Sequence, residues 1–197
     1  MNIHPIVNSL YNSCTYVLHT AKCTQCCLID CGDMKFILEY VCQYNLEISS
    51  LFITHTHYDH IYGIKELMNY FPGCIVYTSE WGVKGLASDK LNLSRYHNEP
   101  IIWTGDNINV LHEGDNVELF ANEMMRVMET PGHDRSCLTY KSRNNLFTGD
   151  SFIPGLKVVS NFPNSNNEDA ELSLRRIRLL SRNCHLYPGH IFYNNSK

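Results

Sequence analysis

The sequence predicts an α/β fold in which helices cover the outer faces of packed β-sheets. Three observations support this prediction. The first half of the chain alternates short apolar segments, turns and segments with helical spacing; the second half contains a series of short strand-like segments; and one long amphipathic segment follows near the end. The chain has 197 residues, 44% of them hydrophobic, and no internal repeat or low-complexity linker. We therefore expect a single domain of residues 1–197.

The first expected unit is a hairpin followed by a helix. Thr15–His19 and Cys26–Asp30 are rich in β-favouring residues, and the polar stretch Thr20–Gln25 between them suits the turn of a hairpin. A Gly-Asp pair ends the second strand, and Met34–Tyr44 carries apolar side chains at helical spacing.

The same pattern then repeats. Ser50–Thr54 is predicted as a short strand, His55–His60 as a polar loop and Ile61–Phe71 as a helix ended by a Pro-Gly pair. Beyond them we expect a strand at Cys74–Thr78 and a mixed stretch at Ser79–Pro100 that begins with a short helix, Glu80–Ala87.

A second sheet is predicted for the rest of the chain, where turn-forming Gly, Asn and Asp pairs separate short strands. Glu168–Arg182 is predicted as a helix, and the polar run Asn164–Asn167 before it supplies a cap. The expected strands are Ile101–Trp103, Asn109–Leu111, Val117–Ala121, Met124–Glu129, Cys137–Lys141 and Leu146–Thr148.

The charge balance and the absence of long apolar segments bear on the class of partner. Lys and Arg number 16 against 20 Asp and Glu, a net charge of −4, so no general attraction to phosphate backbones is expected. No segment approaches the roughly 20 consecutive apolar residues that span a bilayer, and Met1–Leu10 lacks the features of a signal peptide. We expect a cytoplasmic protein that acts on a small molecule, with neither a membrane nor a nucleic acid as partner, and we leave its oligomeric state open.

Nine cysteines, an odd number, indicate that most thiols are reduced. Cys23 and Cys26 have CxxC spacing, which makes a thiolate metal site one alternative. No second CxxC pair follows, and Cys27 and Cys31 lie in an apolar, strand-like run. We favour buried or surface thiols for these four residues and leave their role open.

A dense group of potential metal ligands lies between a predicted strand and a predicted helix. The segment Thr54–His60 has the pattern HxHxDH and supplies three imidazoles and a carboxylate, which bind divalent transition metals. His55 and His57 point the same way in an extended segment, so both can reach one ion. Asp59 and His60 belong to the following turn and helix start, so they can address a second ion.

Three later positions complete this set. His133 and His190 each end a Pro-Gly-His sequence, and Asp150 ends Thr-Gly-Asp. Each follows an apolar, strand-like run, and the preceding glycine lets the backbone turn sharply there. Loops that are distant in the sequence can thus converge at one sheet edge.

The order HxHxDH, PGH, TGD and PGH resembles the metallo-β-lactamase-fold hydrolase superfamily. The resemblance runs from Leu28–Asp33, which is similar to the superfamily's LIDxGD strand end, to His190. It implies a four-layer αββα sandwich, with two mixed β-sheets and helices on the outer faces. It also implies a ligand for every expected position: His55, His57 and His133 for a first metal, Asp59, His60 and His190 for a second, and Asp150 as the bridge.

Within the superfamily, the chain looks most similar to small glyoxalase-II-like hydrolases. This resemblance implies a binuclear hydrolase in which a hydroxide bridging two divalent ions cleaves a thioester or ester, for example a hydroxyacyl thioester. Asp59 would ligate the second metal and orient the hydroxide as a catalytic residue. Oxygen and nitrogen ligands suit zinc, the expected ion, and also iron or manganese.

Several alternative functions are compatible with the same candidate metal ligands. One is a mononuclear-iron persulfide dioxygenase that uses the equivalents of His55, His133 and Asp150. Others are a lactonase, a metal-dependent nuclease, a β-lactamase proper, and a binding or sensor module without turnover. The chain ends seven residues after His190, so we expect no C-terminal glutathione-binding helices and leave the natural substrate open.

The pocket walls are expected to come from two loops, Ser79–Pro100 and Ser151–Pro163. Lys157 in the second loop is a candidate anion-binding residue, and Tyr58 and Tyr62 are candidates for the wall. We expect no functional role for the histidines outside the motifs, for Cys137 or for the basic stretch of the last helix. These histidines are His4, His19, His97, His112 and His185.

Overall fold

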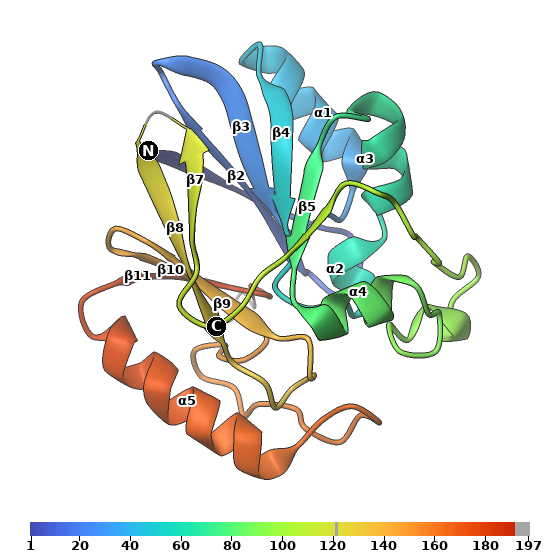
Figure 1. Cartoon of the computed structure of the whole chain (residues 1–197), viewed down its shortest axis with the longest axis vertical. Coiled ribbons are helices and arrows are strands. Elements are labelled where there is room, and N and C mark those ends of the chain that lie inside the picture. Colours follow the sequence, from blue (N-terminus) through green and yellow to red (C-terminus); the bar gives the residue numbers. More distant parts are fainter. Residues whose placement is uncertain (121, 192–197) are drawn as a thin grey trace, which may run out of the picture.

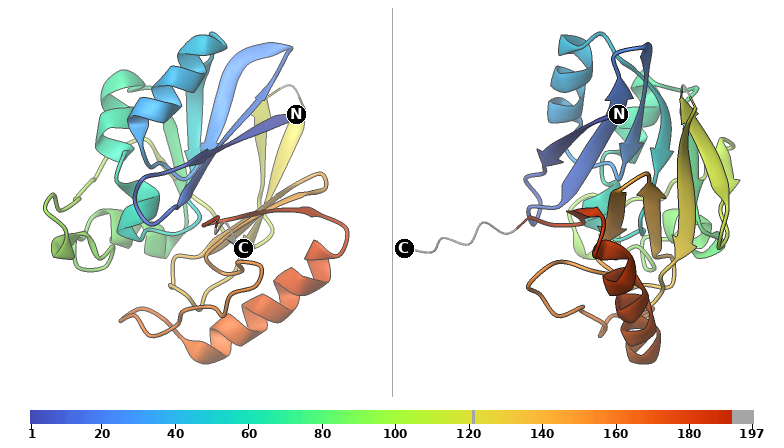
Figure 2. Two further views of the ribbon diagram at one scale, coloured as in Figure 1. Left: turned by 180° about the vertical axis from the view of Figure 1, so that it is seen from behind. Right: turned by 90° about the vertical axis from the view of Figure 1, so that its left-hand side faces the viewer.

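The computed structural model describes residues 1–120 and 122–191. Two β-sheets pack face to face, with helices α1 (Met34–Gln43) and α3 (Ile64–Tyr70) outside one sheet and α5 (Asn167–Ser181) outside the other (Figures 1 and 2). This arrangement confirms the predicted αββα sandwich. No helix among the described residues is both long and apolar enough to cross a membrane.

The first sheet has six strands in the order β1-β2-β3-β4-β5-β6. Strands β1 to β3 pair antiparallel, whereas β3 to β6 pair parallel. The strands are β1 (Asn2–Val7), β2 (Cys14–Thr20), β3 (Cys23–Ile29), β4 (Glu47–Phe52), β5 (Ile75–Thr78) and β6 (Ile108–Val110), and the short helices on this side are α2 (Tyr58–Ile61), α4 (Glu80–Leu86) and the 3-10 helix η1 (Ser94–Tyr96).

The second sheet has five strands in the order β11-β10-β9-β8-β7. All neighbours pair antiparallel except β10 and β11, which are parallel. The strands are β7 (Asn116–Phe120), β8 (Glu123–Glu129), β9 (Leu138–Ser142), β10 (Asn145–Gly149) and β11 (His185–Pro188).

Strand β3 contributes to the core on both of its faces. Cys26 and Leu28 pack with α1 and α3, whereas Cys27 and Ile29 pack between the two sheets. Successive side chains of a strand point to opposite faces, and a strand in a covered sheet is apolar on both. The continuous apolar run in the sequence therefore matches a strand buried on both sides.

The same alternation separates the CxxC pair. Cys23 packs on the side of the second sheet, and Cys26 packs on the side of the helices. All nine cysteines are free thiols, and Cys27 and Cys31 are buried. The structure thus favours ordinary thiols over a thiolate metal site formed by this pair.

The predicted strand Ile101–Trp103 was wrong. The backbone of Ile101 bonds to side chains instead of a neighbouring strand: its N–H donates to Ser94 Oγ at 2.8 Å, and its carbonyl accepts from Asn92 Nδ2 at 2.9 Å. These contacts satisfy the buried backbone groups without a sheet. The segment therefore forms an extended connection.

The structure changes three further expectations. The strand predicted at Asn109–Leu111 is present as β6, but it extends the first sheet beside β5. The helix predicted at Ile61–Phe71 is present as α3, and the end of the predicted polar loop His55–His60 is helical, as α2; the chain passes between them at Gly63, where an added Cβ would lie 2.2 Å from the carbonyl oxygen of Gly32. Strand Val117–Ala121 corresponds to β7, and Ala121 lies outside the described residues.

Strand β1 was not predicted, and β11 was expected only as a strand-like run before His190, without bounds. Strand β1 contains Pro5, which lacks a backbone N–H and is tolerated here because β1 is an edge strand of the first sheet. Strand β11 has only four residues, too few for a clear alternation.

Helix α5 begins with the predicted polar cap and docks on the loop before β9. Asn166 Oδ1 accepts from the backbone N–H groups of Glu168 and Asp169 at 2.9 and 3.1 Å. Gly132 has a φ of +136°, and a Cβ there would lie 2.2 Å from Cα of Ala170. Only glycine fits this close approach between helix and loop.

A Gly132→Ala substitution is expected to destabilise the protein more than Gly114→Ala. Both glycines have positive φ, but nothing lies within 4 Å of a Cβ added at Gly114. The control should lose about 1 kcal/mol from backbone strain alone, and Gly132→Ala should lose at least about 2 kcal/mol more from overpacking. Urea unfolding of both variants measures the difference, and equal losses would contradict the close approach to α5.

Candidate metal centre

The seven predicted ligands come together at one edge of the sandwich. They lie on the loop after β4, on α2 and on the segments that follow β8, β10 and β11. Each of three groups offers ligand atoms within 4.8 Å of one another. The first group is His55, His57 and His133, the second is Asp59, His60 and His190, and the third, His55, His60 and Asp150, shares members with both and adds Asp150.

The first group consists of imidazoles from two segments. His133 Nε2 lies 2.9 Å from His57 Nδ1, and the ring of His55 lies 4.7 and 5.0 Å from the rings of His57 and His133, centroid to centroid. His55 is fully buried, and its Nε2 has no hydrogen-bond partner. A buried nitrogen without a partner is unfavourable, so this group fits a bound cation.

The second group surrounds the carboxylates of Asp59 and Asp150. His190 Nε2 lies 3.2 Å from Asp59 Oδ2 and 3.3 Å from Asp150 Oδ2. His60 Nε2 lies 3.4 Å from Asp59 Oδ2 and 3.5 Å from Asp150 Oδ1. Asp150 Oδ2 also lies 3.5 Å from His133 Nε2, so this carboxylate stands between the two groups.

Acceptors outside the centre orient three of the imidazoles. His133 Nδ1 donates to the carbonyl of Val159 at 2.7 Å, and His190 Nδ1 donates to the carbonyl of Tyr11 at 3.0 Å. His60 Nδ1 donates to Asp30 Oδ2 at 2.9 Å. A carbonyl can only accept, so the proton of a neutral ring lies on Nδ1 and the lone pair of Nε2 points into the centre.

The carboxylates and the burial of the site shift several pKa values. Burial lowers the pKa of His60, but Asp59 and Asp150 outweigh it and raise that pKa to about 9. Burial also opposes protonation of His190, yet the same two carboxylates raise its pKa to about 11. Burial and the neighbouring His60 lower the pKa of His55 well below its usual range. His55 is therefore a neutral donor, as metal binding requires.

The spacing and chemistry of the donors fit a divalent ion. Two ligands bound at about 2.1 Å to a tetrahedral ion lie about 3.4 Å apart, and the nitrogen–oxygen distances within the second group are 3.2 to 3.5 Å. The donors are nitrogen and oxygen atoms, which suit zinc, iron or manganese.

Two buried aspartates support the ligands and were not predicted as site residues. Asp30 accepts from Thr54 N–H and Thr54 Oγ1, both at 2.7 Å, and from His60 Nδ1. Asp134 Oδ2 lies 3.6 Å from His57 Nε2, and Asp134 Oδ1 accepts from Ser136. In the sequence, Asp30 can be recognised as the aspartate at the end of an apolar strand, and Asp134 as the aspartate directly after a Pro-Gly-His motif.

A cavity of about 680 Å³ opens beside the centre. The two predicted loops contribute to its wall, as does Tyr58, whereas Tyr62 is not a lining residue. Tyr11 and Asn12, which were not predicted as lining residues, lie in the turn between β1 and β2 and have φ values of 54°. The lining residues are Tyr11, Asn12, His57, Tyr58, Asp59, Leu93, Tyr96, His97, His133, Asp150, Ile153, Leu156, Lys157, Val158, Val159, Phe162 and His190.

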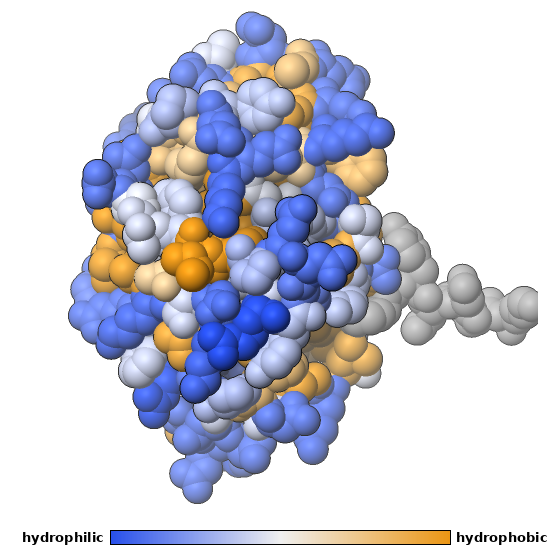
Figure 3. Space-filling model, turned by 90° about the vertical axis from the view of Figure 1, so that its right-hand side faces the viewer, coloured by the Kyte–Doolittle hydropathy of each residue, from blue (hydrophilic) through white to orange (hydrophobic). Residues whose placement is uncertain are grey.

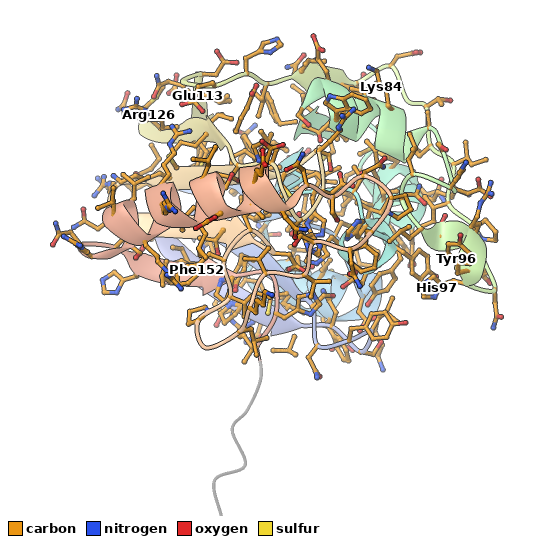
Figure 4. All side chains as sticks on the ribbon, turned by 90° about the horizontal axis from the view of Figure 1, so that it is seen from below. Lys84, Tyr96, His97, Glu113, Arg126 and Phe152 are labelled. Atoms are coloured by element: carbon orange, nitrogen blue, oxygen red, sulfur yellow. The ribbon has the colours of Figure 1, made fainter. Side chains whose placement is uncertain are left out.

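His97 corrects the expectation that histidines outside the motifs have no role at the site. It lines the cavity, and its ring stacks on Tyr58 with centroids 4.0 Å apart. Tyr96 and His97 lie side by side at the edge of the molecule (Figure 4). The surface on the side of α3 and residues 79–100 is mainly hydrophilic, with small groups of apolar side chains (Figure 3).

Comparisons with known proteins agree with this geometry. The protein-family model described as the metallo-beta-lactamase superfamily matches residues 12–190. A hydroxyacylglutathione hydrolase of Pseudoalteromonas translucida (strain TAC 125) is 27% identical over 176 residues, which cover 89% of this chain and 59% of the relative. The chain spans about three fifths of the length of the curated relatives it matches.

Two solved structures share the fold. The BLEG-1 B3 metallo-beta-lactamase has a TM-score of 0.88 at 20% identity, with 97% of this chain and 92% of that chain covered. ETHE1 from Myxococcus xanthus has a TM-score of 0.78 at 23% identity, with 99% and 78% covered. At these identities the likeness concerns the fold alone.

An Asp30→Asn substitution is expected to weaken both folding and metal binding. Asparagine tolerates the positive φ of 58° at this position. Its NH₂ group, however, would replace an accepting oxygen and face one of the groups that donate a hydrogen bond to Asp30. The free energy of unfolding should fall by about 1–3 kcal/mol, and metal affinity should fall roughly 10- to 100-fold. Urea unfolding and competition with a chelator measure the two effects.

The matched control for this experiment is Asp106→Asn. Asp106 is exposed, so this variant should match the parent protein in both measurements. If Asp30→Asn also matched the parent protein, Asp30 would not support the ligand His60.

Proposed function

The chain belongs to the metallo-beta-lactamase superfamily, and we propose that it is a binuclear metal-dependent hydrolase that cleaves a thioester or ester bond. The observation that carries the proposal is the convergence of seven nitrogen and oxygen ligands beside a cavity, with Asp150 between the two groups. In this proposal His55, His57 and His133 hold one ion, Asp59, His60 and His190 hold the other, and Asp150 bridges them.

A bound pair of divalent ions would lower the pKa of a water molecule and polarise the carbonyl of the substrate. The residues of the chain orient the reactants. Asp59 lines the cavity and lies next to His190, so its carboxylate can accept a hydrogen bond from the attacking water and direct its lone pair.

A thioester fits this site as the substrate bond. A thiolate is a good leaving group because thiols have a pKa of about 8.5. The carbon–sulfur bond can therefore break without protonation of the leaving group by a general acid. The relatives named hydroxyacylglutathione hydrolases support a thioester-cleaving activity.

A second candidate is a mononuclear-iron persulfide dioxygenase. His133 Nε2 lies 3.5 Å from Asp150 Oδ2, and the rings of His55 and His133 are 5.0 Å apart. Two imidazoles and one carboxylate are the facial ligand set of many non-haem iron oxygenases. The complete second group of ligands favours the binuclear hydrolase over this candidate.

Of the two other reactions considered, lactone hydrolysis is compatible with the site and nucleic-acid cleavage is disfavoured. A lactone is a cyclic ester, so a lactonase falls within the proposed reaction. A nuclease is disfavoured by the net charge of −4 and by the apolar character of the cavity wall.

Protein purified without added metal is expected to contain about two zinc ions per chain, one for each group of ligands. Elemental analysis for zinc, iron and manganese measures the content. His57→Ala should reduce it, because His57 belongs to the first group, whereas His112→Ala should not, because His112 is exposed and outside the centre. About one iron per chain, with oxygen uptake on a persulfide substrate, would favour the dioxygenase instead.

An Asp59→Ala variant is expected to stay folded and to lose roughly 100- to 1,000-fold in kcat, because the attacking water loses its acceptor. Thioester hydrolysis by metal-loaded protein, with circular dichroism as the check on folding, measures this effect. Asp106→Ala is the matched control and should turn over at the parent rate. Unchanged turnover in Asp59→Ala would rule out the proposed role.

A further inference from the structure

We propose that the cavity beside the metal centre selects a compact apolar acyl group, so that the substrate is a thioester or ester of a medium-length aliphatic or aromatic acid. This inference rests on the proposed function, which supplies the hydrolytic reaction. The preference for an apolar acyl group is argued from the residues of the cavity wall. It differs from recognition of a glutathione thioester, whose peptide part is polar and charged.

One wall of the cavity is apolar and begins at the candidate metal ligands. Phe162 makes edge contacts with the rings of His57 and His133, with centroids 5.0 and 5.6 Å apart. Leu156 and Val159 continue this wall, and they are 47% and 49% exposed. Apolar side chains that face a cavity next to a reactive centre favour burial of an apolar ligand.

The wall is also held in place relative to the centre. The carbonyl of Val159 accepts from Nδ1 of His133 at 2.7 Å, and Ser165 Oγ donates to the carbonyl of His133 at 2.5 Å. The segment between β10 and α5 is therefore bonded to a candidate ligand at two points. An acyl group on this wall would keep its carbonyl near the centre.

The second wall is aromatic. Tyr58 and His97 stack with centroids 4.0 Å apart and planes 22° apart, and Tyr11 meets His97 edge-on at 6.3 Å. Leu93 and Tyr96 extend this wall, and Tyr96 is 77% exposed (Figure 4). Flat rings and aliphatic side chains on two sides suit an alkyl chain or an aryl group.

The charges of the wall disfavour glutathione. Among the described lining residues outside the candidate ligands, Lys157 is the one formally charged side chain. Glutathione in a thioester carries two carboxylates and an ammonium group, and burying charges without partners is costly. Lys157 offers a partner to a single carboxylate at most.

The test measures binding independently of turnover. Thioethers of N-acetylcysteamine, in which CH₂ replaces the thioester carbonyl, are titrated into metal-loaded protein by calorimetry. Each buried methylene should tighten binding about fourfold, so the S-hexyl compound should bind at least about tenfold more tightly than the S-ethyl compound if only two of its additional methylenes are buried. Equal affinities for the two compounds would overturn the inference.

Two variants locate the effect. Leu156→Ser removes an aliphatic side chain from the wall and should reduce the preference for the S-hexyl compound by at least about threefold, the loss of roughly one buried methylene or more. Leu172→Ser is the matched control: Leu172 is 63% exposed on α5 and does not line the cavity, so the preference should not change. A preference that survives Leu156→Ser in full would also overturn the inference.

Hydrolysis assays separate this inference from the proposed function. The substrates are acetyl- and hexanoyl-N-acetylcysteamine and S-lactoylglutathione. The hexanoyl compound as the fastest of the three substrates supports both proposals. Either S-lactoylglutathione as the fastest substrate, or turnover of the acetyl compound at least as fast as that of the hexanoyl compound, overturns the inference while it supports thioester hydrolysis. If none is hydrolysed but the S-hexyl thioether still binds more tightly, the proposed reaction fails and the apolar specificity stands.

Discussion

The arrangement of the candidate metal centre depends on the buried carboxylate of Asp30. The backbone N–H of Asp30 donates to the carbonyl of Phe52 at 2.9 Å, and the side chain of Asp30 accepts from Thr54 and His60. It therefore joins the end of β3 to the loop after β4 and to α2, which carry four of the seven ligands. A carboxylate can accept several bonds at once, so one side chain orients the segment on which the HxHxDH motif lies.

Two of the three remaining candidate ligands, His133 and His190, are oriented by backbone carbonyls of residues that also line the cavity. Val159 orients His133, and Tyr11 orients His190, and both residues line the cavity. Ligand orientation and the shape of the wall are thus coupled through the same segments. A change in the segment between β10 and α5 would affect metal binding and substrate choice together.

The two sheets and α5 supply the rigid frame for these loops. Three apolar clusters fill the spaces between helices and first sheet, between the sheets, and between second sheet and α5. Arg176 Nη2 of α5 lies 2.5 Å from Oε1 of Glu113, in the connection between β6 and β7, and Glu113 and Arg126 lie close together beside this helix (Figure 4). The loop with Gly132 is held against the N-terminal part of α5, which fixes where His133 projects.

The sequence by itself identified the seven candidate ligands, because His and Asp side chains after a strand end or a glycine carry their chemistry in a local pattern. It also determined most strands and helices, as in β3 and α5, because alternation and helical spacing are local properties. Only the tertiary structure decided that Asp30 and Asp134 support the ligands, that Tyr11 and His97 line the cavity, and that Ile101–Trp103 is not a strand. These features depend on contacts between residues far apart in the chain, for which a single sequence contains no local signal.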